Sequence, residues 1–172
     1  MHSNHAEPIS LLLVSTHSAT AALLRRLMEQ HGLSGEIRRV DPGRGAIAVA
    51  RRGRPGNDEP APDIVMLDFS APEARSISFL QQIARGTPPL PAPVVLLTSP
   101  ESEALLRSGN LRFNDSRVFA PTSLPCFMRK MREHPRQRFL RALSIMADLG
   151  PILVDLPDAR AEQPELSAAL SA

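Results

Sequence analysis

The chain has 172 residues, 42% of them apolar, which suits one domain with a buried core and extensions. Its formal net charge is +2 from 20 basic and 18 acidic residues, so charge alone does not indicate nucleic-acid binding. The one cysteine, Cys126, excludes an intramolecular disulfide and fits a reducing compartment. The N-terminus has no signal pattern, and no apolar run approaches the roughly 20 residues that span a bilayer. We therefore expect a cytoplasmic protein that does not contact a membrane.

Apolar runs alternate with amphipathic segments along the first two thirds of the chain. The runs predict buried strands at residues 9–14, 63–68 and 94–97, a more polar strand at 36–40, and a short strand at 117–119. Helical spacing of apolar residues predicts helices that end near residue 31 and that span 43–52, 73–84 and 100–111. Strands that alternate with helices imply right-handed crossovers, so the fold class is α/β with a doubly wound parallel sheet.

Asp68 is the first candidate for function. It comes at the end of the apolar strand 63–68, where that strand emerges from the core. In an open parallel sheet, chemistry collects at the carboxyl ends of the strands. Thr98 ends the strand 94–97 in the same way, and Ser15 and Thr16 follow the strand 9–14. Asp68 is therefore the first place to look for a functional site.

This layout resembles the receiver domain of two-component response regulators. The resemblance covers about residues 9–121 and rests on five βα units, Asp68, Thr98, and a residue followed by Pro121 after the fifth strand. The stretch from Phe139 through Leu156-Pro157 is similar to the last helix and apolar ending of single-domain regulators that partner phytochrome-type histidine kinases. The resemblance implies a flavodoxin-like (CheY-like) sheet of five strands in the order 2-1-3-4-5 with a C-terminal helical extension.

The resemblance also suggests a domain organisation. Gly150-Pro151 should end a helix that begins near residue 136, and the chain after Pro157 is acidic and rich in alanine. We expect a disordered tail at 1–8, a receiver-like domain at 9–157 with an insertion near 123–135 and an apolar extension at 139–157, and a mobile tail at 158–172.

The family's functional positions carry unusual residues in this chain. The resemblance makes Asp68 the phosphoacceptor, Thr98 the switch residue and Ser70 the residue whose carbonyl contacts the metal. The acidic pair that holds Mg²⁺ aligns with Ser15 and Thr16, and the lysine that precedes the proline aligns with Ala120, before Pro121. Mg²⁺ binds anionic oxygen in octahedral geometry and is held weakly by hydroxyl groups. We predict weak or absent Mg²⁺ binding, no other cofactor or metal, and poor phosphorylation of Asp68.

Two arrangements of Asp68 remain open at this point. Its carboxylate could accept hydrogen bonds from Ser15, Thr16 and Thr98 without a metal, or it could be solvated at the end of its strand. A conventional regulator that is phosphorylated on Asp68 is the main functional alternative. No Gly-x-Ser-x-Gly, Walker loop or His/Cys metal spacing is present, so we do not expect an enzyme.

Anion and nucleic-acid binding are further alternatives. The hydroxyl-rich segment 15–20 precedes a helix, where backbone N–H groups favour an anion such as the phosphate of FMN. It contains no glycine, and the chain has no Trp or Tyr to cover a flavin. The segment 129–141 holds six basic residues against Glu133, but no helix-turn-helix domain follows it. We do not expect nucleic acid as a partner.

The expected function is that of a stand-alone, degenerate receiver (a pseudo-receiver) that acts by protein–protein contact in two-component signalling. Its partner would be a histidine kinase, another signalling protein or a second copy of this chain. A helix that is apolar on two sides has one side left to bury in an interface. The predicted dimer interface consists of Phe139, Leu143, Met146, Leu149, Ile152 and Leu153.

Overall fold

The computed structural model describes most of the N-terminal two thirds of the chain and short segments beyond it. The described residues are 8–52, 61–71, 73–85, 90, 92–108, 122–123, 128–129 and 152–155. The strands are β1 (Ile9–Val14), β2 (Gly35–Val40), β3 (Ile64–Phe69), β4 (Val94–Thr98), β5 (Thr122–Ser123) and β6 (Ile152–Asp155). The helices are α1 (Ser18–Gln30), α2 (Arg44–Arg52), α3 (Ala74–Arg85) and α4 (Pro100–Arg107).

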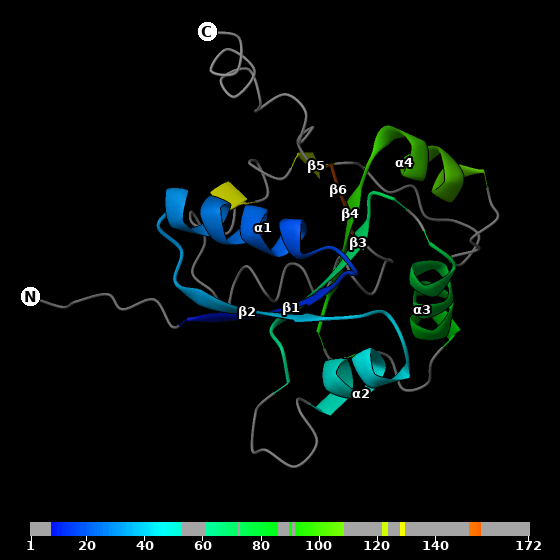
Figure 1. Cartoon of the computed structure of the whole chain (residues 1–172), viewed down its shortest axis with the longest axis horizontal. Helices are drawn as coiled ribbons and strands as arrows, with labels where there is room; N and C mark the ends of the chain where they lie inside the picture. Colours follow the sequence, from blue (N-terminus) through cyan, green and yellow to red (C-terminus); the bar gives the residue numbers. More distant parts are fainter. Residues whose placement is uncertain are drawn as a thin grey trace, which may run out of the picture.

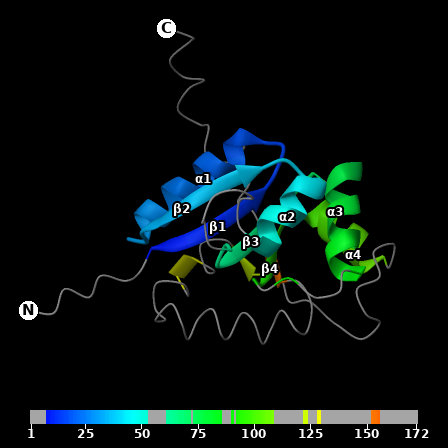
Figure 2. The same cartoon turned by 90° about the horizontal axis from the view of Figure 1, so that it is seen from below.

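The strands of the described residues join in one parallel sheet with the order β2-β1-β3-β4-β6-β5. Helix α1 covers one face of this sheet, and α2, α3 and α4 lie on the other (Figures 1 and 2). The predicted doubly wound α/β fold is therefore confirmed, together with the order of the first four strands. No helix among the residues described here has the length and apolar character needed to cross a membrane.

The two faces of the sheet have separate cores because successive side chains of a strand point to opposite sides. Leu11 and Leu13 of β1 pack with Leu24 and Leu27 of α1. Leu12 and Val14 of the same strand face the α2, α3 and α4 side. Strand β3 is buried along its whole length, as its continuous apolar sequence predicts for a central strand.

Two glycines determine how α1 connects to β2. Gly32 has a φ of 64°, a left-handed conformation that ends α1 as predicted. At Gly35, an added Cβ would lie 2.4 Å from the carbonyl oxygen of Ile9 and 2.8 Å from the Met28 methyl carbon. Glycine therefore allows the start of β2 to approach β1 closely.

The C-terminal part of the sheet corrects one prediction. The apolar residues Ile152 and Leu153 were expected to add interface surface beyond the main fold, but they pair with Val95 and Leu96 of β4. Strand β6 thus lies beside β4, where the prediction placed residues 117–119, which are outside the described residues. A short apolar run fits a strand and an apolar extension equally well, because its periodicity does not distinguish them.

Candidate functional site

The candidate site lies where β1, β3 and β4 end, at one edge of the parallel sheet. Asp68 is the second-last residue of β3 and pairs in register with Leu97 of β4. Its side chain is 5% exposed, so this carboxylate is buried in the protein and not solvated at the strand end. A buried carboxylate requires compensating hydrogen bonds.

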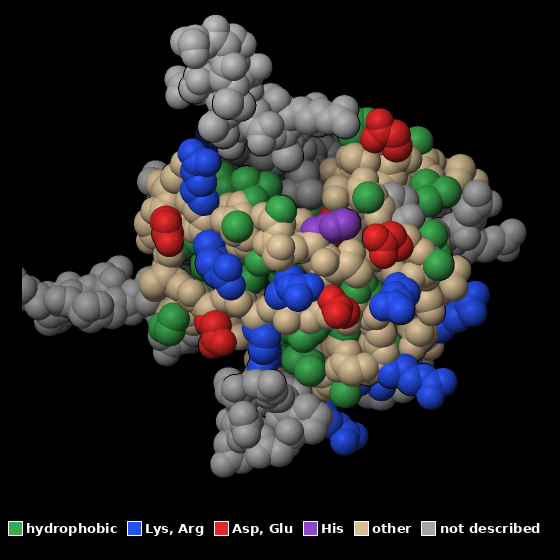
Figure 3. Space-filling model, viewed as in Figure 1, with side chains coloured by type: hydrophobic (Ala, Val, Ile, Leu, Met, Phe, Trp, Pro, Cys, Tyr) green, Lys and Arg blue, Asp and Glu red, His purple; other side chains and the backbone are tan. Residues whose placement is uncertain are grey.

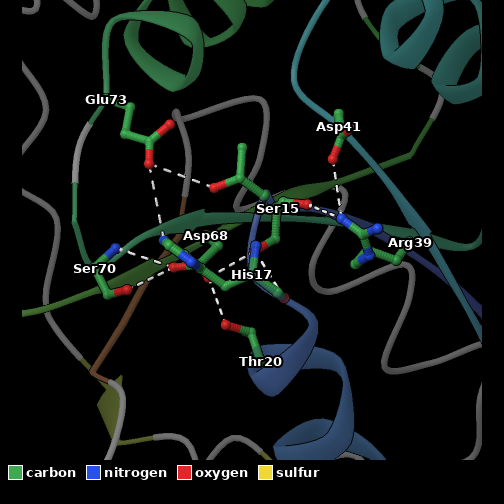
Figure 4. A network of polar contacts seen from close by, with 9 residues as sticks. Ser15, His17, Thr20, Arg39, Asp41, Asp68, Ser70 and Glu73 are labelled. Carbon is green, nitrogen blue, oxygen red and sulfur yellow. Dashed lines mark hydrogen bonds and ion pairs between the residues drawn. The ribbon is translucent and has the colours of Figure 1, made fainter.

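Four hydrogen bonds meet the two oxygens of the Asp68 carboxylate (Figure 4). The Oδ2 atom accepts from Ser15 Oγ at 2.8 Å and from Thr20 Oγ1 at 2.6 Å. The Oδ1 atom accepts from Ser70 Oγ at 2.6 Å and from the Ser70 backbone N–H at 3.2 Å. We call Ser15, Thr20, Asp68 and Ser70 the Asp68 network. Every donor in it is electrically neutral.

Thr20 was not among the predicted site residues, although it makes one of the two shortest of these contacts. It lies in the first turn of α1 and is 9% exposed. Its position four residues before Leu24 and seven before Leu27 puts it on the buried face of the helix. A threonine on the core side of an amphipathic helix, just after a strand end, is the signal that would have identified it.

Ser15 also organises the loop that leads into α1. Its Oγ accepts the backbone N–H of His17 at 3.0 Å, and its own N–H donates to the carbonyl of Val40. Arg39 Nη1 donates to the Ser15 carbonyl at 2.8 Å and to Asp41 Oδ1 at 2.9 Å. The backbone around Ser15 is therefore held from β2 as well as from Asp68.

Thr16 does not take the place predicted for it beside Asp68. Its side chain is exposed, and its Oγ1 donates to Glu73 Oε1 at 3.5 Å. His17 Nε2 lies 3.9 Å from the same Glu73 oxygen, and both of these side chains are about half exposed. These contacts join the loop after β1 to the start of α3 on the outside of the Asp68 network (Figure 4).

Thr98 and Ser99 lie at the end of β4, beside the end of β3. Thr98 is fully buried and lies opposite Phe69 and Asp155 in the sheet. Ser99 Oγ donates to the Ser70 carbonyl at 2.8 Å and accepts the Ser102 N–H at 3.3 Å, which caps α4. At this helix start, the backbone N–H of Glu101 and then the Ser99 hydroxyl lower the pKa of the Glu101 carboxyl.

Several predicted positions cannot be placed relative to the site. Ala120 and Pro121 lie outside the described residues, as do the interface residues Phe139, Leu143, Met146 and Leu149. The basic segment 129–141 is described only at its first residue. On the face in Figure 3, both acidic and basic side chains of the described residues are visible.

The residues at this site do not fit the Mg²⁺ ion that receiver domains use. The network has one carboxylate, and both of its oxygens already accept hydrogen bonds. Within the described segments, no group of three or more His, Cys, Asp or Glu could hold a metal. The Ser70 carbonyl accepts a hydrogen bond from Ser99. Mg²⁺ needs several hard oxygen ligands in octahedral geometry, and this donor set consists of hydroxyl groups directed at one acid.

The same geometry argues against a phosphate or FMN site in segment 15–20. The buried carboxylate of Asp68 already lies at the N-terminus of α1, where an external anion would have to bind. Ser15 and Thr20 both donate to it. A second anion would repel Asp68 and would compete for the same two hydroxyl protons.

No protein-family model matches the chain. The chain is 30% identical over 127 residues to the probable methanogenesis regulatory protein FilR2 of Methanothrix harundinacea, covering 74% of this chain and 81% of that protein. It shares 24% identity with the bacteriophytochrome response regulator RtBRR, with a TM-score of 0.51 over 81% of this chain and 94% of that one. Against the bacteriophytochrome response regulator AtBRR the identity is 26% and the TM-score 0.49, over 61% of this chain and 77% of that one.

These relationships agree with the layout of the fold. The RtBRR likeness shows a shared fold, and the FilR2 identity extends over most of both chains. The parallel order β2-β1-β3-β4 places Asp68 and Thr98 at neighbouring strand ends, as the receiver resemblance requires. The chain therefore belongs to the response regulator receiver family.

Proposed function

We propose that this protein is a degenerate receiver domain that acts by protein–protein contact, with little or no Mg²⁺-dependent phosphorylation of Asp68. The observation that carries this proposal is the Asp68 network itself. The carboxylate that would accept the phosphoryl group instead accepts four hydrogen bonds from its own chain. Its role in this proposal is structural, and no catalytic step is assigned to it.

The chemistry of phosphoryl transfer supports this proposal. Transfer to an aspartate requires positive groups that neutralise the developing charge on the phosphoryl oxygens. Removing one preorganised donor of this kind typically costs about 3–4 kcal/mol, or roughly 10²–10³ in rate. In this chain, Ser15 and Thr16 stand where the family has its acidic pair, and Ala120 stands where it has its lysine.

The proposed partner is a histidine kinase or another signalling protein, including a second copy of this chain. RtBRR and AtBRR are described as bacteriophytochrome response regulators, which supports a partner from a light-sensing kinase system. The proposal of a homodimer rests on the apolar spacing of Phe139, Leu143 and Met146. Light scattering at high micromolar concentration tests it, and a strictly monomeric mass would contradict it.

The direct test is incubation with acetyl phosphate and Mg²⁺, followed by intact-mass measurement. We expect no stoichiometric gain of mass, under conditions where a receiver with its full acidic pair and lysine is labelled. The matched control is Asp68→Asn, which should give the same spectrum of adducts as the natural chain. A gain of one phosphate that disappears in Asp68→Asn would establish the conventional phosphoacceptor function and refute this proposal.

A further inference from the structure

A continuous run of hydrogen bonds joins α1 to α4 through Asp68. Thr20 in the first turn of α1 donates to Asp68, and Ser70 donates to the other oxygen of the same carboxylate. The Ser70 carbonyl then accepts the Ser99 hydroxyl at 2.8 Å. Ser99 is the N-cap of α4. We call this run, from Thr20 to Ser99, the Asp68–Ser99 link.

Ser99 takes part both in the hydrogen bond to the loop after β3 and in the cap of α4. Its hydroxyl donates to the Ser70 carbonyl at 2.8 Å and also faces the Glu101 carboxyl, whose pKa it lowers. Its oxygen accepts the Ser102 N–H, while the Ser102 hydroxyl accepts the Ser99 N–H at 2.8 Å. Ser102 is fully buried. Hydrogen bonds of Ser99 therefore connect the loop after β3 to the first turn of α4.

We infer that the Asp68–Ser99 link holds the first turn of α4 in one position and makes Asp68 and Thr20 positioning residues. This inference rests on the proposed function and specifies its regulation. In a domain whose carboxylate is not modified, the α4 surface is set by these internal hydrogen bonds. The protein then presents the same α4 surface whether or not a phosphodonor or Mg²⁺ is present.

The strength of the contacts supports this role. Hydrogen bonds to an ionised carboxylate are shorter and stronger than those between neutral groups. Thr20 Oγ1 and Ser70 Oγ both lie 2.6 Å from Asp68 oxygens, in a site where Asp68 is 5% exposed. A donor removed from such a buried site is not replaced at once by solvent. Losing this donor should therefore change the hydrogen bonds that Ser15 and Ser70 make to the same carboxylate.

Hydrogen–deuterium exchange of the full chain tests the link. Thr20→Val keeps the shape of the side chain and removes the donor. The hydrogen bond that Thr20 donates goes to Asp68 and not to α4, so any effect on α4 must pass through Asp68. We expect the amides of Ser102 and Glu103 to exchange about tenfold faster in Thr20→Val, the change that losing one charge-assisted hydrogen bond produces. Thr20→Ser retains the hydroxyl and should exchange at the natural rate.

Global destabilisation is controlled with Ile37→Val, a core change in β2 that leaves the link intact. It should not accelerate Ser102 and Glu103 selectively. If Thr20→Val does not fold, Ser15→Ala removes a different donor from the same Asp68 oxygen and gives the same readout. Unchanged α4 exchange in the folded variant would overturn the inference.

A second variant locates the connection at Ser99. Ser99→Asp keeps an acceptor that caps α4 but has no proton to donate to the Ser70 carbonyl. In this background, Thr20→Val should no longer accelerate exchange in α4, and a persisting effect would refute the link. Phosphorylation of Asp68 by acetyl phosphate would refute the proposed function whatever these exchange rates are. The two failures can therefore be told apart.

Discussion

Ser15 and Asp68 lie 53 residues apart in the sequence and are joined by a hydrogen bond of 2.8 Å between buried side chains. At the position of Ser15, the receiver family has an acidic residue, and two buried carboxylates at this separation would repel each other without a metal. The serine replaces that repulsion with a direct donor–acceptor contact. The site can therefore be complete without an ion.

Restoring the acidic pair should restore metal binding. In Ser15→Asp with Thr16→Asp, the new carboxylate at position 15 crowds Asp68 and the one at position 16 adds negative charge beside Glu73, so we expect a lower melting temperature than that of the natural chain without Mg²⁺. Mg²⁺ at about a hundredfold excess over its Kd should raise the free energy of unfolding of the double variant by about 2.7 kcal/mol. This corresponds to an increase of roughly 5–10 °C in its melting temperature. Differential scanning calorimetry with and without Mg²⁺ measures this change.

The matched control is Ser15→Asn with Thr16→Asn, which has similar bulk and no added charge. Mg²⁺ should change the melting temperature of this control, and of the natural chain, by no more than an equal ionic strength of another salt does. A natural chain stabilised as strongly as the acidic variant would show that the hydroxyl site binds the metal after all.

Removing the Asp68 carboxylate should destabilise the fold. In Asp68→Ala, the hydroxyls of Ser15 and Thr20 lose their common buried acceptor, and we expect a loss of at least about 3 kcal/mol in the free energy of unfolding. Asp68→Asn keeps one acceptor oxygen and the hydroxyls can rotate, so it should lose about 1–2 kcal/mol. Urea unfolding measures both values. Equal stability of all three proteins would mean that the network is not structural.

Glu101 should contribute to stability in a pH-dependent way. Its pKa in the folded protein is lowered from 4.5 by its own backbone N–H and then by the Ser99 hydroxyl. Its contribution is therefore present above the unfolded value and is lost as the pH falls through the folded pKa. The stability difference between the natural chain and Glu101→Gln should be measurable at pH 7 and should vanish at lower pH. A difference that grows on acidification would contradict this assignment.

Two glycine substitutions should change stability in opposite directions. In Gly35→Ala, the new Cβ would lie 2.4 Å from the Ile9 carbonyl oxygen, so β1 and β2 must separate and we expect a clear loss of stability. Gly45 lies in the first turn of α2 with nothing within 4 Å of an added Cβ, and Gly45→Ala should stabilise by at most about 0.5–1 kcal/mol, the difference found in helix interiors. Thermal unfolding of the pair tests both, and a neutral Gly35→Ala would show that the strands can adjust.

The sequence alone determined the order of strands and helices up to α4. The continuous apolar runs of β1 and β3 identify central strands of a parallel sheet, because such strands are buried on both faces and cannot alternate. Asp68 was identifiable because it ends such a run, where functional residues of an open parallel sheet collect, and Ser15 was identified through the receiver resemblance. The same reasoning could not separate a sheet strand from an apolar extension at Ile152–Asp155, which is too short for a period to show.

Only the tertiary structure decided which hydroxyl groups contact Asp68. Ser15 and Thr16 are adjacent in the sequence and chemically alike, yet Ser15 faces the carboxylate and Thr16 faces Glu73. The direction of each side chain depends on how the loop after β1 turns into α1, and this turn is held by Arg39, Val40 and Asp68 from distant parts of the chain. Thr20 joins the network because α1 packs on β1 with its threonine toward β3. A hydrogen bond depends on distances of a few tenths of an ångström, and long-range packing sets those distances.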